Sequence, residues 1–393
     1  MMNHIRSGEQ VTDKRGIEEA DEKFNIINLV CTGAMMKIFP CRNIAGKTLE
    51  WYSQSDQLPQ DMDNDKWVFI RKSMSYVNEM IVMKKYNDAC LLLEKIKKYQ
   101  QKECDVLLPA DNKFNADKIY NQFDYSKSVA MACICIGLIC FIYYCHCMAS
   151  QKRTSRKAII ILNILLWIVF TYLSAAICLR GYVSNHLPLS NGFETMQFMA
   201  WCTLLLTFLL QRKFAMLLPF GFLLCGLTLM VSMLGESNPQ ITQLMPVLQS
   251  PLLSIHVVVI MIAYSLLAFI MLNGVTAVIL HQSQKECKEQ IERLQIISQI
   301  ILYPAIFLLA IGIFIGAVWA NVSWGRYWGW DPKEVWALIT MLVYALALHP
   351  RSLPWFHRTM FFHVFCITAF ITVLITYFGV NFLLGGMHSY ANG

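Results

Sequence analysis

The sequence predicts an all-α polytopic membrane protein, with about eight transmembrane helices and an N-terminal region outside the membrane. Two observations predict this fold class. Hydrophobic residues make up 56% of the 393 positions and charged residues only 15%, whereas soluble domains carry about 25% charged residues. From residue 128 onward, apolar stretches follow one another, each near the length of about 20 residues that crosses a bilayer. A disordered chain and a wholly soluble chain are both excluded.

The N-terminal region, residues 1–127, is predicted to be a polar and partly helical domain. Residues 66–101 carry apolar residues at helical spacing and contain no Gly or Pro, as in an amphipathic helical domain. The weakly apolar stretch 24–40 contains Lys37 and is too short to span a bilayer. This region holds 19 basic and 19 acidic residues, so the whole net charge of +7 belongs to residues 128–393.

The second predicted domain, residues 128–393, contains the membrane helices. Its basic surplus reports membrane orientation and does not indicate nucleic-acid binding. The predicted spans are 128–149, 158–179, 195–211, 214–234, 252–280, 296–318, 332–349 and 360–386.

Eleven of the fourteen basic residues of this domain fall in alternate loops, and only Arg180, Arg326 and Lys333 fall in the opposite set. By the positive-inside rule, the loops rich in Lys and Arg lie in the cytoplasm. The loops near 180–195, 235–251 and 319–331, and the C-terminus, then face outward. With the first span ending inside, residues 1–127 lie outside, although no signal peptide precedes them. They are either a tail translocated by the first span or, as we prefer, part of a longer polypeptide with earlier spans.

The outward stretch 319–336, called the tryptophan loop below, carries five tryptophans in eighteen residues. An interfacial aromatic belt is the simpler interpretation. We favour a platform for a large, flat, apolar ligand, because indoles supply stacking area and the intervening glycines allow close approach of the backbone. The predicted ligand-binding residues are Trp319, Trp324, Gly325, Arg326, Trp328, Trp330, Asp331 and Trp336.

The tryptophan loop also contains a helix start. Asp331 followed by Pro332 and Glu334 predicts an N-cap, a proline in the first helical turn and an acidic residue that closes the cap. We therefore expect Asp331 to fix the loop against the helix, and a direct ligand contact is the second interpretation.

Three histidines are candidate metal ligands. His256 and His388 lie at outer ends of predicted spans, on the side of the tryptophan loop. Two imidazoles beside an aromatic platform suit the axial positions of a planar metal macrocycle. His349 lies 18 residues beyond Asp331, roughly 27 Å along a helix, so it belongs near the cytoplasmic side. His363 is predicted to be a buried hydrogen-bonding residue, and His186 is open to either role.

These residues resemble a known family. The pattern Trp324-Gly-x-x-Trp328-x-Trp330-Asp331-x-Lys333-Glu334 is similar to the WWD loop of membrane haem-handling proteins in cytochrome c maturation. Residues 188–195, Pro-Leu-Ser-Asn-Gly-Phe-Glu-Thr, are similar to an outer loop of the CcsA (ResC) branch, with Phe193 replacing Tyr and Thr195 replacing Ser. The surroundings of His256, His349 and His388 match that branch as well. The resemblance covers residues 128–393, and residues 1–127 are the expected end of a CcsB-like half.

The resemblance implies a System II cytochrome c synthase in the cytoplasmic membrane, with its active site on the extracytoplasmic face. Haem b would pass from an inner site that includes His349 to an outer site with His256 and His388 as iron ligands. There it would be joined to the CxxCH motif of apocytochrome c. The implied partners are a CcsB (ResB)-like protein or fused half, apocytochrome c, a thiol-reducing thioredoxin-like protein and the lipid bilayer. No catalytic residue is expected beyond those that position haem.

Two alternatives stay open at this point. The chain could be a haem exporter or delivery protein that binds haem without forming the thioether bond, or, less in keeping with the motifs, an ordinary transporter. The outward residues Arg326 and Arg180 could pair with haem propionates or equally with lipid phosphates.

Overall fold

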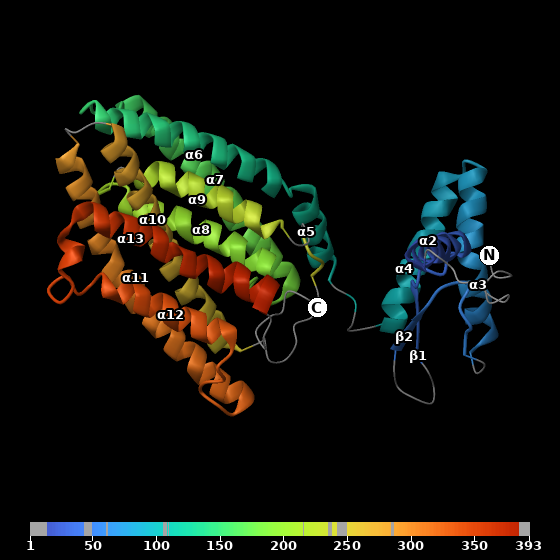
Figure 1. The fold of residues 1–393 in the computed structure, drawn as a ribbon. Helices are drawn as coiled ribbons and strands as arrows, with labels where there is room; N and C mark the ends of the chain where they lie inside the picture. The colour runs from blue at the N-terminus through green and yellow to red at the C-terminus, as the bar shows by residue number, and fades with distance from the viewer. Residues whose placement is uncertain are drawn as a thin grey trace. The chain divides into compact units, whose positions relative to one another are not determined.

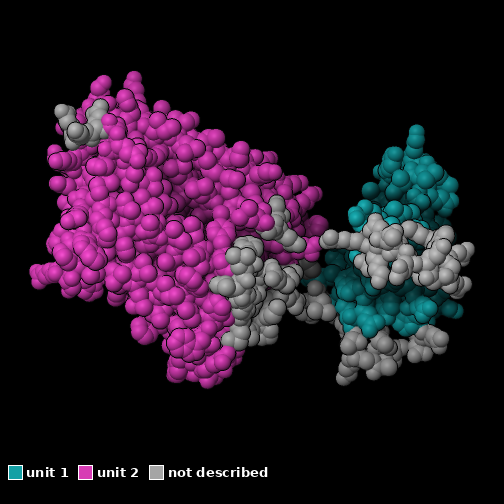
Figure 2. Space-filling model, in the orientation of Figure 1, with its two compact units in different colours: residues 1–110 teal, residues 111–393 magenta. Residues whose placement is uncertain are grey.

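A computed structural model describes residues 14–42, 49–59, 62–104, 108, 110–214, 216–234, 238–241, 250–283 and 287–384. The chain divides into two compact units, residues 1–110 and residues 111–393, which Figure 2 draws in different colours. Each unit has its own hydrophobic core, and each is described below by itself.

In its described residues, the first unit combines three helices with a small β-hairpin. Helix α2 (Lys14–Thr32) is followed by strands β1 (Phe39–Arg42) and β2 (Leu49–Tyr52), which pair antiparallel. The amphipathic stretch expected at 66–101 forms two helices, α3 (Asn64–Val82) and α4 (Tyr86–Cys104). The chain turns between them at Lys84, which has a φ of 58°. Apolar faces of these elements meet at a core of Phe39, Ile70, Val77 and Ile96.

The second unit is an α-helical bundle (Figure 1), as the all-α prediction requires. It begins with α5 (Asp111–Gln122), a polar helix that packs on α7. Each of the eight predicted spans then contains a helix: α6 (Ser126–Ala149), α7 (Arg156–Ser184), α8 (Gly192–Leu210), α9 (Leu217–Ser232), α10 (Pro251–Ser283), α11 (Lys288–Trp324), α12 (Pro332–Leu346) and α13 (Thr359–Leu374).

Among the residues that the structure describes, six of these helices are long and apolar enough to cross a membrane, when α13 is taken with its continuation to Val380. Helices α9 and α12 are shorter, with 16 and 15 residues. Helix α9 is buried along most of its length because it packs against both α6 and α8. The chain is therefore a multi-pass membrane protein, and two of the predicted spans are shorter helices than expected.

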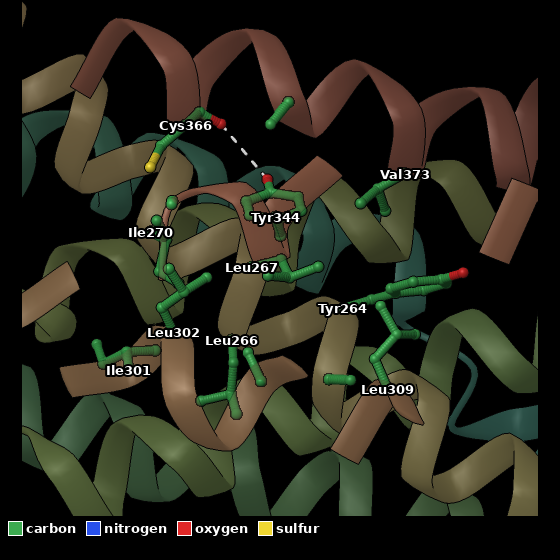
Figure 3. Packing of buried hydrophobic residues seen from close by; sticks show 14 of the residues in the cluster. Tyr264, Leu266, Leu267, Ile270, Ile301, Leu302, Leu309, Tyr344, Cys366 and Val373 are labelled. Carbon is green, nitrogen blue, oxygen red and sulfur yellow. Dashed lines mark hydrogen bonds between the residues drawn. The ribbon is translucent and has the colours of Figure 1, made fainter. Parts of the chain in front are cut away.

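Helix α10 lies at the centre of the bundle and packs on α8, α11 and α13. Figure 3 shows the core that these helices form: Tyr264, Leu267 and Ile270 of α10 lie among side chains of α11, α12 and α13. The Tyr344 hydroxyl of α12 donates a hydrogen bond to the backbone oxygen of Cys366 in α13, at 3.4 Å. This core holds α12 in place although the helix is short.

The last span changes its helical winding. Helix α13 continues without a break into π-helical turns, Ile375–Leu384 (η3). Such winding is rare and frequently occurs at functional sites. Segment η3 packs on α12, where the Thr340 and Thr376 hydroxyls lie 3.3 Å apart. Segment η3 is therefore held beside α12.

Candidate functional site

A cavity of about 260 Å³ lies between the helices of the second unit, at the ends joined by loop 325–331. Its walls come from six parts of the chain: loop 189–192 with the start of α8, helices α10 and α11, the loop 325–331, the start of α12, and η3. Its lining includes His256, Trp319, Trp328, Lys333 and Tyr377. We call it the His256 cavity, because His256 is the one histidine among its lining residues that the structure describes.

His256 is held in one orientation by the neighbouring helix. Its Nδ1 lies 2.7 Å from the backbone oxygen of Gly312 in α11. A carbonyl oxygen only accepts, so Nδ1 carries the proton and the lone pair of the neutral ring is on Nε2. This second contact, which fixes the tautomer, is typical of histidines that bind metals.

Gly316 makes the room that the imidazole occupies. A Cβ atom at Gly316 would lie 2.7 Å from the Cε1 atom of His256. Any larger residue one helical turn after Gly312 would therefore displace the ring. The pair Gly312 and Gly316 thus supplies a hydrogen-bond acceptor and a cradle on the same face of α11.

The tryptophans of the tryptophan loop divide into two groups. Trp319, with 1% of its surface exposed, and Trp328 line the cavity beside His256. Trp324 packs with its edge on Trp319, the ring centroids being 4.8 Å apart. Trp330 packs edge-on against Trp328 at 6.1 Å but is 77% exposed. Trp324, Trp330 and the half-buried Trp336 are not among the lining residues that the structure describes. The cavity lining therefore includes two of the five tryptophans expected in the platform.

The helix start predicted at Asp331 is confirmed. The Asp331 carboxylate accepts a hydrogen bond from the backbone N–H of Lys333, and Pro332 begins α12. The Glu334 carboxylate accepts hydrogen bonds from the backbone N–H groups of Gly329 at 2.8 Å and of Asp331 at 3.3 Å. Together they form a capping box that fixes loop 325–331 on the helix. Asp331 is buried and does not line the cavity.

The loop glycines serve the local backbone. Gly325 ends α11 with a φ of 73°, a conformation that glycine adopts without steric cost. A Cβ atom at Gly329 would lie 3.3 to 3.4 Å from the guanidinium of Arg326, which therefore packs over this glycine. Arg326 is exposed and is not a lining residue. The glycines were expected to allow close approach of a ligand, but the helix end at Gly325 and the packing of Arg326 over Gly329 already account for them.

The segment 188–195 forms another wall of the cavity. Asn191 caps α8 by accepting a hydrogen bond from the backbone N–H of Glu194 at 2.9 Å. The Glu194 carboxylate accepts from both the backbone N–H and the hydroxyl of Ser190, at 2.8 and 2.6 Å. These bonds close the loop on itself and present Ser190, Asn191 and Gly192 to the cavity.

Arg180 is not available to a ligand, which corrects the expectation that it could pair with a propionate. Its side chain is 1% exposed, and its Nε donates to the Glu194 carboxylate at 2.7 Å. Its other nitrogens donate to the Tyr120 hydroxyl, to Asn238 and to the backbone oxygen of Pro239. Arg180 instead braces the wall that Glu194 holds.

The brace extends to α5 through Tyr120. The Tyr120 hydroxyl accepts from Arg180 at 3.3 Å and donates to the Asn238 side chain at 3.2 Å. Burial raises the pKa of this hydroxyl, although the charge of Arg180 acts in the opposite direction. Tyr120 therefore keeps the proton that it donates, and the network is satisfied at every step.

His349 and His363, two further histidines that the structure describes, are not among the lining residues. Helix α12 ends at Leu346, three residues before the predicted boundary. Pro350 disfavours helical backbone at the residue before it, His349, so the helix could not reach that boundary. His349 follows in a turn, exposed, with its Nδ1 2.9 Å from the backbone oxygen of Ala345. His363 is buried, and its Nε2 contacts the backbone oxygen of Ile291, as expected of a hydrogen-bonding residue. His388 lies outside the described residues.

Several lining residues were not singled out from the sequence. Tyr264 projects from α10, and Thr376 and Tyr377 come from η3. No local pattern distinguishes them from core residues of a span. Lys333 also lines the cavity; the sequence placed it in the helix start after Asp331 and in the motif of the tryptophan loop, but assigned it no ligand contact.

The lining fits a planar group that brings its own equatorial metal ligands. Among the described residues no three or more His, Cys, Asp or Glu side chains come together to hold an ion by themselves. One oriented imidazole beside two indoles can serve a metal macrocycle, which needs the protein only at its axial positions and faces.

Comparisons with known proteins agree with this geometry. Residues 189–388 match the model of the family described as cytochrome C assembly protein. The chain is 31% identical over 379 residues to protein NrfI of Wolinella succinogenes, covering 95% of this chain and 42% of NrfI, so it spans less than half of that relative. It is 35% identical to the cytochrome c biogenesis protein CcsA of Chlamydomonas reinhardtii, covering 61% of this chain and 71% of CcsA. The CcsA protein of Prochlorococcus marinus is 31% identical, with coverages of 62% and 87%.

Proposed function

This chain belongs to the cytochrome c assembly protein family, in its CcsA (ResC) branch, and from that premise we propose that it delivers haem for covalent attachment to apocytochrome c. The observation that carries the proposal is the His256 cavity. One cavity is lined by an imidazole of fixed tautomer and by two indoles, those of Trp319 and Trp328. Haem is the substrate here, and it needs an axial ligand and flat apolar contact.

In the proposed outer site, His256 and His388 are the axial ligands of the haem iron. Trp319 and Trp328 cover the macrocycle and exclude water from it. Loop 189–192 and η3 close the remaining walls. The chain would therefore act by holding haem at a fixed position and angle, which is the part of the work that a protein contributes when the substrate carries the reactive groups.

The proposed reaction is the addition of two cysteine thiols of a CxxCH motif to the two vinyl groups of haem. Each sulfur forms a C–S bond to one vinyl carbon, the S–H bond breaks, and its proton passes to the other vinyl carbon. The C=C bond thereby becomes a single bond. The addition needs no external electrons, but both cysteines must be reduced. A thiol-reducing thioredoxin-like protein is the partner that this requirement implies.

The second part of the proposal concerns the route of haem across the membrane. We place the tryptophan loop on the extracytoplasmic face of the cytoplasmic membrane and His349 toward the cytoplasm, following the distribution of basic residues. His349 would contribute one ligand of an inner site, together with a CcsB-like protein or half. Its exposed side chain, at the end of α12 away from the His256 cavity, suits a site completed by another surface.

The test is covalent attachment in membranes. The chain is produced with a CcsB-like half and an apocytochrome carrying CxxCH, and haem that stays with the apocytochrome on a denaturing gel is quantified. We expect His256→Ala to abolish covalent haem, and added imidazole to restore part of it by filling the vacant axial position. The wild-type chain binding haem in membranes without any covalent product would favour haem delivery without thioether formation. Unchanged attachment by His256→Ala would overturn the assignment of the site.

A further inference from the structure

We propose that Lys333 binds a carboxylate of the ligand in the His256 cavity, and so determines which edge of the ligand faces the start of α12. The inference rests on the function proposed above and deepens it by assigning a residue to the anionic edge of haem. It replaces the two arginines, Arg180 and Arg326, that the sequence suggested for this role.

Lys333 is placed to do this by the capping box of α12. Its backbone N–H donates to Asp331, so the main chain of Lys333 is fixed at the first turn of the helix. Its half-buried side chain lines the same cavity as His256 and Trp328. A change of the Lys333 side chain leaves the backbone donor of the cap in place, which makes the residue suitable for substitution.

Three carboxylates near the cavity have partners within the chain, among them Asp331, which accepts the backbone N–H of Lys333. Glu334 also lines the cavity, but its carboxylate accepts hydrogen bonds from the backbone N–H groups of Gly329 and Asp331. Glu194 is paired with Arg180 behind the wall. Of the lining residues that the structure describes, Lys333 is thus the lysine or arginine that contributes positive charge to the cavity.

The helix adds to the attraction for an anion at this position. Lys333 lies in the first turn of α12, where the helix dipole is positive. A carboxylate that enters the cavity on this side therefore meets an ammonium group and a helix start together. A charge-assisted hydrogen bond of this kind is among the stronger polar contacts in proteins.

The chemistry of haem turns this contact into orientation. Haem carries its two propionates on one edge and its vinyl groups away from that edge. A propionate held by Lys333 directs the vinyl groups away from the start of α12. The same contact that selects a carboxylate would thereby present the reactive carbons to an approaching peptide.

The experiment compares two ligands that differ in charge at the propionates and by two ester methyl groups, so the wild-type preference is read against that of the Lys333 variants. The full chain in detergent is titrated with haemin and with haemin dimethyl ester, whose propionates are neutralised, and the Soret band reports binding. We expect the wild-type chain to bind haemin about tenfold to a hundredfold more tightly than the ester. Lys333→Gln should abolish this preference while leaving the affinity for the ester unchanged, and Lys333→Arg should keep most of it.

Lys288→Gln is the matched control, because Lys288 is an exposed lysine at the far end of α11. It should keep the wild-type preference. A preference that persists in Lys333→Gln, or that Arg326→Gln abolishes instead, overturns the assignment of Lys333 while the proposed function stands. A wild-type chain that binds neither ligand in a manner dependent on His256 overturns both.

Discussion

His256 and His349 are oriented by the same device in opposite surroundings. Each ring places its Nδ1 within 2.9 Å of a backbone carbonyl oxygen, of Gly312 and of Ala345 respectively. Each neutral ring therefore has its lone pair on Nε2, as a metal ligand requires. His256 lies in a cavity lined by indoles, whereas His349 is exposed in a turn after α12. The comparison teaches that orienting a histidine ring and enclosing it are separate tasks, and that of these two histidines His256 is both oriented and enclosed.

The largest expected effect concerns the brace behind the His256 cavity. Arg180→Met leaves the Glu194 carboxylate buried without its cation, so we expect the free energy of unfolding to fall by about 3 to 5 kcal/mol. Arg351→Met, an exposed change near His349, should alter it by less than about 0.5 kcal/mol. Denaturant titration of the detergent-solubilised chain measures both. Equal losses at the two positions would contradict the view that only the cavity end is braced.

The next effect compares the two histidines directly. In the chain by itself, His256→Ala should lower haem retained on purification by roughly tenfold or more, since loss of even an outer-shell partner costs metal sites that much. His349→Ala should leave it unchanged, because that side chain is exposed. Pyridine haemochrome assay gives the haem content. Stoichiometric haem that depends on His349 in the isolated chain would break the comparison.

The tryptophans sharpen the comparison between enclosed and exposed positions. Trp328→Ala removes a ring from the cavity wall and should weaken haem binding by about 1 to 3 kcal/mol. Trp330→Ala removes an exposed ring and should cost less than about 0.5 kcal/mol. Trp328→Phe should lie between these values. If all these variants instead lose abundance in the membrane at constant haem per molecule, the loop is an interfacial belt.

The smallest expected effect tests the cradle of His256. Gly316→Ala should displace the imidazole, because the new methyl group would lie 2.7 Å from it, and overpacking of this kind costs about 1 kcal/mol or more. The readouts are a weaker haem titration and a fall of about 1 kcal/mol in the free energy of unfolding. Gly181→Ala is the control, since its nearest neighbour would lie at an ordinary 3.4 Å. Similar titrations for both variants would show that the ring has room to move.

Much of this molecule was predictable because its signals are local. Runs of apolar residues placed helices in all eight expected spans, and Asp331 with Glu334 placed the start of α12. The β-hairpin of β1 and β2 was not predicted, since four-residue strands carry little periodic signal. The turn that divides 66–101 into α3 and α4 was missed as well, because it contains neither Gly nor Pro.

The site was predictable only in part. The sequence itself determined which residue types could meet haem, because tryptophan density, an outer histidine and a helix cap are properties of short segments. Only the tertiary structure decided that Trp328 lines the cavity while Trp330 is exposed. It also decided that Arg180 forms an ion pair with Glu194, and that Tyr377, far along the chain, lines the same cavity. The physical reason is that burial and pairing depend on which helix packs beside which, and that information lies in contacts between residues far apart in the sequence.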